Sequence, residues 1–175
     1  VILLDDTGFA HFGCYGSTIA TPNVDRLATA GLRYTNFHTT ALCSPTRACL
    51  LTGRNHHTVG MRSVSNMRSG FPHLRGHITK HAATVAELLS DEGYGTYCVG
   101  KWHLTPMADT SAAGPFDHWP LQRGFGRFYG FLGGETDQFH PELTIDNHHV
   151  EAPAGPDEGY HLSADLVDQA IGFLH

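Results

Sequence analysis

The sequence has little positive charge, no long apolar run and few lysines. Lysine and arginine together number 11 against 17 aspartates and glutamates, which gives a formal net charge of −6. Because binding to nucleic-acid phosphates needs a basic surface, we expect no nucleic-acid partner. The apolar runs are also much shorter than the roughly 20 residues of a membrane-spanning helix, so we expect no membrane partner.

The cysteines also lack a pattern. Cys14, Cys43, Cys49 and Cys98 include no Cys-x-x-Cys pair, so neither a zinc site nor a disulfide framework is favoured. Unpatterned cysteines favour the bacterial cytoplasm slightly over the periplasm or secretion. The sequence opens without methionine or a targeting signal, in what looks like a strand already under way. We therefore expect the 175 residues to be the N-terminal part of a longer catalytic domain.

What is present is typical of a globular protein. Hydrophobic residues make up 41% of the chain and charged residues 16%, which argues against disorder. Glycine occurs 20 times and histidine 14 times. So much histidine indicates metal or proton chemistry, although surface histidines account for many such counts.

Short apolar segments alternate with helical patterns along the chain. We predict strands in four apolar segments: 1–4, 32–40, 94–100 and 127–134. We predict helices where cap residues flank periodic segments: 21–31, 44–53, 84–93 and 163–174. Residues 55–80 carry no clear periodicity and are expected to be irregular. This order predicts an α/β fold with a mixed, mainly parallel sheet and helices on both faces.

Several helix starts have a specific cap prediction. Ser44 precedes a proline and is expected to cap the helix that follows Cys43, with Pro45 at the first helical position. Thr84 and Glu87 have the spacing of a capping box, and Ser163 is the expected cap of the last helix.

Cys43 lies at such a helix start, where free N–H groups and the helix dipole favour negative charge. Arg47, four residues on, can reach the same end and hold an oxyanion. A thiol there could be a buried core group, a metal ligand, half of a disulfide or a nucleophile. These residues alone do not decide among the four.

Four more residues follow predicted strands, where ligands of parallel sheets gather. Asp5 and Asp6 follow the first strand, and two carboxylates suit a hard cation such as Ca²⁺ or Mg²⁺. Lys101 and His103 end the third strand and combine a fixed cation with a group that can move a proton. Solvated aspartates and an exposed strand end are the alternatives.

The segment "GGETDQFH", residues 133–140, is a weaker candidate. Its glycines permit close backbone approach, and Glu135, Asp137 and His140 could line a pocket. The favoured interpretation is that these side chains belong to a loop and have no functional role. The pairs His56–His57 and His148–His149 are expected to be surface histidines.

Three of these segments resemble a known family. "CSPTRACLLTGR" is similar to the first signature of type I sulfatases, and "GYGTYCVGKWH" is similar to the second. The opening "LLDDTGF" resembles the paired metal aspartates of the same family. The three segments occur in the family's order, and together they are specific where each alone is not. The resemblance implies the alkaline-phosphatase-like fold and hydrolysis of sulfate esters, with aryl sulfates as the expected class.

The resemblance also implies a mechanism and a partner. A separate formylglycine-generating enzyme would convert Cys43 to Cα-formylglycine, whose hydrate attacks sulfur and expels the alcohol before sulfate leaves. Arg47 would hold the modified side chain, Lys101 would bind the sulfate, and His103 would hydrogen-bond the hydrate and act as the base.

The resemblance further implies a metal that is held by Asp5 and Asp6 and touches the modified Cys43, namely Ca²⁺ with Mg²⁺ as the alternative. The family's other metal ligands, and its second His and Lys, are not assigned in these 175 residues. We therefore expect the 175-residue chain alone to bind metal poorly and to have little activity.

Two alternative functions stay open on the sequence. Relatives that share the Cys-x-Pro-x-Arg pattern include phosphonate monoester and phosphodiester hydrolases. A non-catalytic homologue would keep Cys43 as an unmodified thiol.

Overall fold

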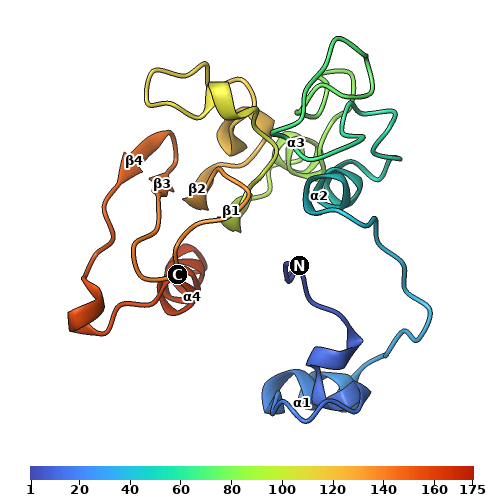
Figure 1. The fold of residues 1–175 in the computed structure, drawn as a ribbon, viewed down its shortest axis with the longest axis vertical. Helices are drawn as coiled ribbons and strands as arrows, with labels where there is room; N and C mark the ends of the chain where they lie inside the picture. The colour runs from blue at the N-terminus through green and yellow to red at the C-terminus, as the bar shows by residue number, and fades with distance from the viewer. The chain divides into compact units, whose positions relative to one another are not determined.

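The computed structural model describes residues 1–175 (Figure 1). The chain divides into two compact units, Val1–Thr40 and Ala41–His175, which are described separately. The helices are α1 (Pro22–Ala30), α2 (Cys43–Thr52), α3 (Val85–Asp91) and α4 (Leu162–Phe173). Short 3-10 turns lie at Phe9–His11, Gly13–Tyr15, Met107–Asp109, Pro120–Arg123 and Pro156–Glu158. None of the helices combines the length and the apolar character that a membrane span needs.

The second unit contains a four-stranded sheet in the order β1 (Tyr97–Lys101), β2 (Arg127–Phe131), β3 (Leu143–Ile145), β4 (His148–Val150). β1 and β2 are parallel, whereas β2–β3 and β3–β4 are antiparallel. The predicted mixed sheet is therefore confirmed. The hairpin of β3 and β4 was not predicted from the sequence, because each strand is only three residues long.

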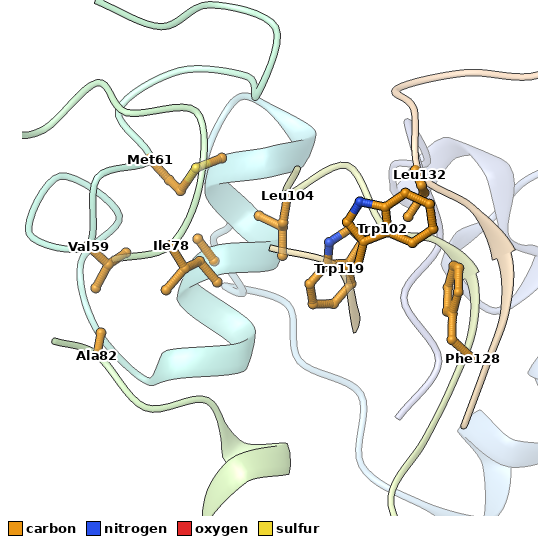
Figure 2. Packing of buried hydrophobic residues seen from close by; sticks show 10 residues of the cluster. Val59, Met61, Ile78, Ala82, Trp102, Leu104, Trp119, Phe128 and Leu132 are labelled. Atoms are coloured by element: carbon orange, nitrogen blue, oxygen red, sulfur yellow. The ribbon is translucent and has the colours of Figure 1, made fainter. Parts of the chain in front are cut away.

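The alternation of side chains along β2 creates a core on each face of the sheet. Phe128 points into a cluster that includes Ala48 of α2, Trp102 and Trp119 (Figure 2). The next residue, Tyr129, points into the opposite cluster, which α4 covers. Because successive strand residues face opposite sides, one strand supports both cores. The expected covering of both faces by helices is thus confirmed.

A glycine pair lets β1 and β2 approach closely. Gly100 and Gly130 are direct partners in the parallel register, with φ of +100° and +156°. A Cβ on Gly130 would lie 2.0 Å from the carbonyl oxygen of Gly100, which no side chain can tolerate. The close strand pairing that leads to Lys101 and His103 therefore requires glycine at position 130.

The predicted capping box at α3 is confirmed. Thr84 Oγ1 accepts a hydrogen bond from the Glu87 N–H at 3.1 Å, and Glu87 Oε2 accepts one from the Thr84 N–H at 2.6 Å. Arg123, which is 2% exposed, pairs with Glu87 at 3.1 Å and donates to the carbonyls of Ile78 and Ala82. Burial alone would raise the pKa of Glu87, but its bonds to Arg123 and to the Thr84 backbone lower it overall.

Two strand predictions are wrong. Neither 1–4 nor 32–40 forms a strand, and the side chains of Val1, Ile2 and Leu4 are exposed. Apolar and β-branched residues favour a pleated, packed surface, but a strand forms only where a neighbouring backbone pairs with it. Neither segment pairs with another strand in this structure.

The starts of two helices also differ from the prediction. α2 begins at Cys43 with Leu42 as its N-cap, two residues before the expected start, which places Pro45 at the third helical position. Proline is tolerated there because the first-turn N–H groups have no partner within the helix. The N-cap of α4 is His161, whose Nδ1 accepts from the Ser163 N–H at 3.1 Å; Ser163 itself lies inside the helix.

We predict that Gly130→Ala lowers the free energy of unfolding by at least about 2 kcal/mol, because the added methyl forces β1 and β2 apart. Thermal or urea denaturation measures this change. Gly172→Ala is the matched control: Gly172 is exposed near the end of α4, and nothing lies within 4 Å of its Cβ position. The control should leave stability unchanged or raise it by about 0.5–1 kcal/mol. Equal stabilities of the two variants would contradict the role of the glycine pair.

Candidate active site

The start of α2 faces the end of β1. Cys43, the first residue of α2, points its Sγ at Nδ1 of His103, 3.1 Å away. His103 follows β1 and continues its pairing, since its N–H donates to the carbonyl of Leu132 at 3.1 Å. The sequence separation of the two side chains is 60 residues. The fold thus brings together two residues that the sequence predicted to share one site.

Ser44 links the two segments through its buried side chain. Its hydroxyl donates to the carbonyl of His103 at 2.6 Å and accepts the N–H of Ser65 at 3.2 Å. Ser44 is fully buried. The serine that was predicted as a helix cap therefore connects α2, the end of β1 and the irregular segment 55–80.

Arg47 makes a second link between the same elements. Its Nη1 donates to the main-chain carbonyl of Lys101 at 2.6 Å. This bond holds the guanidinium beside the last residue of β1, where Lys101 itself is half-buried. Both predicted cations therefore lie at the same end of β1, close to the start of α2.

The backbone of His103 has a left-handed conformation, with φ of +51°. A non-glycine residue adopts this conformation only when its surroundings impose it, and such residues are frequent at functional sites. Beside the ring lies Gly134, where a Cβ would come within 2.7 Å of His103 Cε1. The side chain of His103 is 4% exposed, so the imidazole is held between α2 and the Gly133–Gly134 turn.

Asn66 is a site residue that sequence reasoning missed. Its Oδ1 lies 3.3 Å from Nε2 of His103 and also accepts the hydroxyl of Ser65 at 3.2 Å. Because an amide oxygen only accepts, Nε2 of His103 donates to Asn66, and Nδ1 is the ring nitrogen that faces Cys43. Asn66 lies in the irregular segment, where no periodicity or motif marks it.

The second thiol near the site differs from Cys43. Burial raises the pKa of Cys98, in β1, to about 12, and the nearby Arg47 lowers it only in part. Cys98 packs against the core on the α2 side of the sheet. It therefore stays protonated at neutral pH and is a poor nucleophile.

Asp5 and Asp6 lie in the first unit, ahead of the turn Phe9–His11. The main-chain carbonyl of Asp5 accepts the hydroxyl of Thr7, and Asp6 has a φ of +52°. Their carboxylates are the hard oxygen donors that Ca²⁺ and Mg²⁺ prefer. No group of three or more His, Cys, Asp or Glu side chains is placed to hold a metal ion. The two aspartates therefore fit such an ion in their chemistry alone.

A cavity of about 380 Å³ adjoins His103. Its lining comes from the loop after β1, the turn after β2 and the β3–β4 hairpin: Asn66, His103, Thr105, Met107, Thr110, Leu132, Gly133, Gly134, Glu135, Glu142, Thr144 and His149.

Some of the loop and histidine residues considered from the sequence line this cavity, and others do not. Of the three loop residues considered from the sequence, only Glu135 lines it. Asp137 instead accepts the N–H groups of Phe139 and His140 and caps the loop. His149, predicted to be a surface histidine, is exposed but also forms part of the wall.

The parts of this site define a class. A half-buried cysteine at a helix start, an imidazole aimed at it and two cations at the neighbouring strand end, all on a mixed α/β sheet, are typical of hydrolases that act on anionic esters. The model of the sulfatase family matches residues 1–175, so the chain belongs to the sulfatase family.

Individual relatives agree with this assignment. The chain is 42% identical to human steryl-sulfatase over 135 residues, which cover 74% of the chain and 22% of that protein. It is 32% identical to the arylsulfatase of Klebsiella aerogenes over 149 residues, 83% of the chain and 30% of that protein. The chain spans about a quarter of the length of the curated relatives it matches.

Solved structures share the fold. The crystal structure of Ps i-CgsB superposes with a TM-score of 0.79 at 27% identity, covering 97% of this chain and 39% of that one. The structure of BT4656 in complex with D-glucosamine-2-N,6-O-disulfate gives a TM-score of 0.69 at 30% identity, covering 97% and 29%. The expected sulfatase fold is therefore confirmed.

We predict that Ser44→Ala lowers the free energy of unfolding by about 2 kcal/mol, because the Ser65 N–H and the His103 carbonyl lose a buried partner. Thermal denaturation measures the effect. Ser90→Ala, at an exposed position of α3, is the matched control and should change stability by less than about 0.5 kcal/mol. A Ser44 variant as stable as the control would show that the hydroxyl does not hold the two segments together.

Proposed function

We propose that this protein hydrolyses sulfate esters to an alcohol and inorganic sulfate. The single observation that carries the proposal is the approach of Cys43 to His103, with Arg47 and Lys101 at the same strand end. Membership of the sulfatase family supports the choice of sulfate over other anionic groups. Steryl-sulfatase and arylsulfatases among the relatives support an ester of an alcohol or phenol.

In this proposal Cys43 is oxidised by a maturation enzyme to formylglycine, and the oxygen of the modified side chain lies where the structure has Sγ. Nδ1 of His103, 3.1 Å from Sγ, accepts a hydrogen bond from that oxygen and takes its proton. Asn66 holds the tautomer that makes this transfer possible. Lys101 and Arg47 stabilise the negative charge of the sulfate and of the reacting oxygen.

We also propose that Asp5 and Asp6 contribute to a divalent metal site, with Ca²⁺ as the first choice and Mg²⁺ as the alternative. Such an ion supplies positive charge that polarises the sulfate ester and favours the ionised nucleophile. Both carboxylates precede a turn, and Asp6 has a positive φ that redirects the backbone at this point. Their pairing in the sequence supports a shared ligand role.

The proposed function is tested on the protein expressed from its complete coding sequence together with a formylglycine-generating enzyme. We expect intact mass to show the loss of about 18 Da that converts a thiol to an aldehyde at Cys43, and p-nitrophenyl sulfate to be hydrolysed. Cys43→Ala should remove activity by at least about 1,000-fold. The matched control Cys49→Ala changes a half-buried cysteine of the same helix and should keep the modification and most of the activity.

The same experiment separates the alternatives. Faster hydrolysis of bis(p-nitrophenyl) phosphate than of the sulfate ester would favour a phosphodiesterase. An unmodified Cys43 with no hydrolysis of either ester would indicate a non-catalytic homologue.

We predict that Asn66 sets the pH dependence of the reaction. Asn66→Asp keeps the acceptor and adds a negative charge beside Nε2, which raises the pKa of His103 and should move the acid limb of kcat to higher pH. Asn66→Leu removes the acceptor and should lower kcat by about tenfold or more. Asn23→Asp, at an exposed position in the first turn of α1, adds the same charge elsewhere and should leave the profile in place. An unmoved acid limb in Asn66→Asp would contradict the role of Asn66.

A further inference from the structure

Two histidine rings stack on each other outside the candidate site. The ring centroids of His77 and His118 are 3.7 Å apart, and the ring planes are inclined by only 13°. His77 lies near the end of the irregular segment 55–80, and His118 lies in the loop between the turns Met107–Asp109 and Pro120–Arg123. The stack therefore connects two irregular segments that are far apart in the sequence.

One nitrogen of each ring has no partner. Nδ1 of His77 and Nδ1 of His118 are both shielded from solvent, and neither forms a hydrogen bond. A neutral imidazole carries one N–H group, but an imidazolium carries an N–H group on both nitrogens. Protonation of either ring would therefore leave a charged, buried donor without an acceptor, which costs more than a neutral nitrogen without a partner.

The charges around the stack also oppose protonation. Four cations and two carboxylates face the rings: Arg68, Arg75, Lys80, Arg123, Asp109 and Asp117. Burial lowers the pKa of His77, and Arg75 is the next cause. Burial also lowers the pKa of His118 to about 4, with the neighbouring ring of His77 as the next cause. Both rings are therefore neutral at pH 7.

The segment of His77 supports His103 from one side. Gly76, the residue before His77, packs so closely on Ser65 that a Cβ would lie 2.6 Å from the Ser65 carbonyl oxygen. The hydroxyl of Ser65 donates to Oδ1 of Asn66, which also contacts Nε2 of His103. The position of the irregular segment is thus linked to the position of the imidazole in the site.

The backbone of His118 supports His103 from the other side. Its carbonyl accepts the indole N–H of Trp102 at 2.8 Å and the hydroxyl of Thr105 at 2.9 Å. These two residues lie immediately before His103 and two residues after it. The stack therefore joins the two segments that fix the surroundings of His103.

We propose that the stacked rings of His77 and His118 form an acid-sensitive contact between these two segments. The contact is intact while both rings are neutral, and it breaks when either ring takes up a proton. Its loss separates the segment that carries Asn66 from the loop after β1 and loosens the surroundings of His103. The proposal concerns the folded chain and does not depend on the reaction that the site catalyses.

The sign of the pH dependence follows from the two protonation states. A histidine whose pKa is lower in the folded than in the unfolded state binds its proton more readily when the chain unfolds. Stability contributed by the neutral rings is therefore lost as the pH falls below about 6.5, the usual histidine pKa. For His118 the loss is complete near its folded-state pKa of about 4.

Urea denaturation at pH 7.5 and at pH 5 tests the proposal on the protein expressed from its complete coding sequence. His77→Phe and His118→Phe each keep an aromatic ring in the stack but cannot take up a proton. Between the two pH values, we expect the unfolding constant to rise about tenfold more in the wild type than in either variant. His81→Phe changes an exposed histidine four residues from His77, and this matched control should behave as the wild type does.

Hydrogen exchange locates the change in the wild-type protein. After correction for the intrinsic pH dependence of exchange, the amides of 60–78 and 102–119 should lose protection by about tenfold or more at pH 5. The amides of α4, which covers the opposite face of the sheet, should keep their protection. This measurement decides the question even where a phenylalanine variant does not fold.

Two results would overturn the proposal. One is the same pH dependence of stability in the wild type and in both folded phenylalanine variants. The other is an exchange pattern in which 60–78 and 102–119 keep their protection at pH 5, or in which α4 loses protection to the same extent, because neither pattern is a local opening at the stack.

Discussion

The hydroxyl of Ser44 is the contact on which the candidate site depends. It is fully buried, donates to the carbonyl of His103 and accepts the N–H of Ser65. A single oxygen thus connects α2, the end of β1 and the irregular segment that carries Asn66. Because Cys43 precedes Ser44 by one residue, its distance to His103 follows from this contact. The proposed nucleophile and the proposed base come from distant parts of the sequence, yet one local group sets their separation.

The sheet determines the position of His103, whose carbonyl accepts the hydrogen bond from Ser44. The close pairing of β1 with β2, which Gly130 permits, continues through the N–H of Trp102 and the N–H of His103. Beyond that point β1 can no longer stay extended, since His103 adopts a positive φ. The change of direction turns its side chain toward α2, and Gly134 leaves room for the ring. Strain at His103 is thus balanced by hydrogen bonds on both sides.

Local sequence signals predicted those elements whose stability is local. The Thr84–Glu87 capping box marked α3, and the apolar residues of β1 and β2 marked two strands of the sheet. The strand predictions for 1–4 and 32–40 were wrong because a strand needs a paired neighbour, which composition does not reveal.

The candidate site shows the same division between local and tertiary signals. Cys43, Arg47, Lys101 and His103 were identified from motifs, and the structure brings them to one end of β1. Asn66 and the cavity wall were not identified, because their roles arise from tertiary contacts of loop residues. Glu135 was considered from the sequence only as one of several loop residues. A residue whose role is to hold or surround a reacting group leaves no periodic signal in the chain.

The distribution of charge explains how an acidic chain can hold an anionic group. The net charge of −6 would repel sulfate at long range, but at physiological salt such interactions are screened beyond about 8–10 Å. What matters at the site is the nearest charge, and the chain places one of its two lysines and Arg47 at the end of β1. The carboxylates of Glu135 and Glu142 lie in the adjoining cavity. In the proposed function, the anionic head of a sulfate ester would lie beside Arg47 and Lys101 at this end of β1.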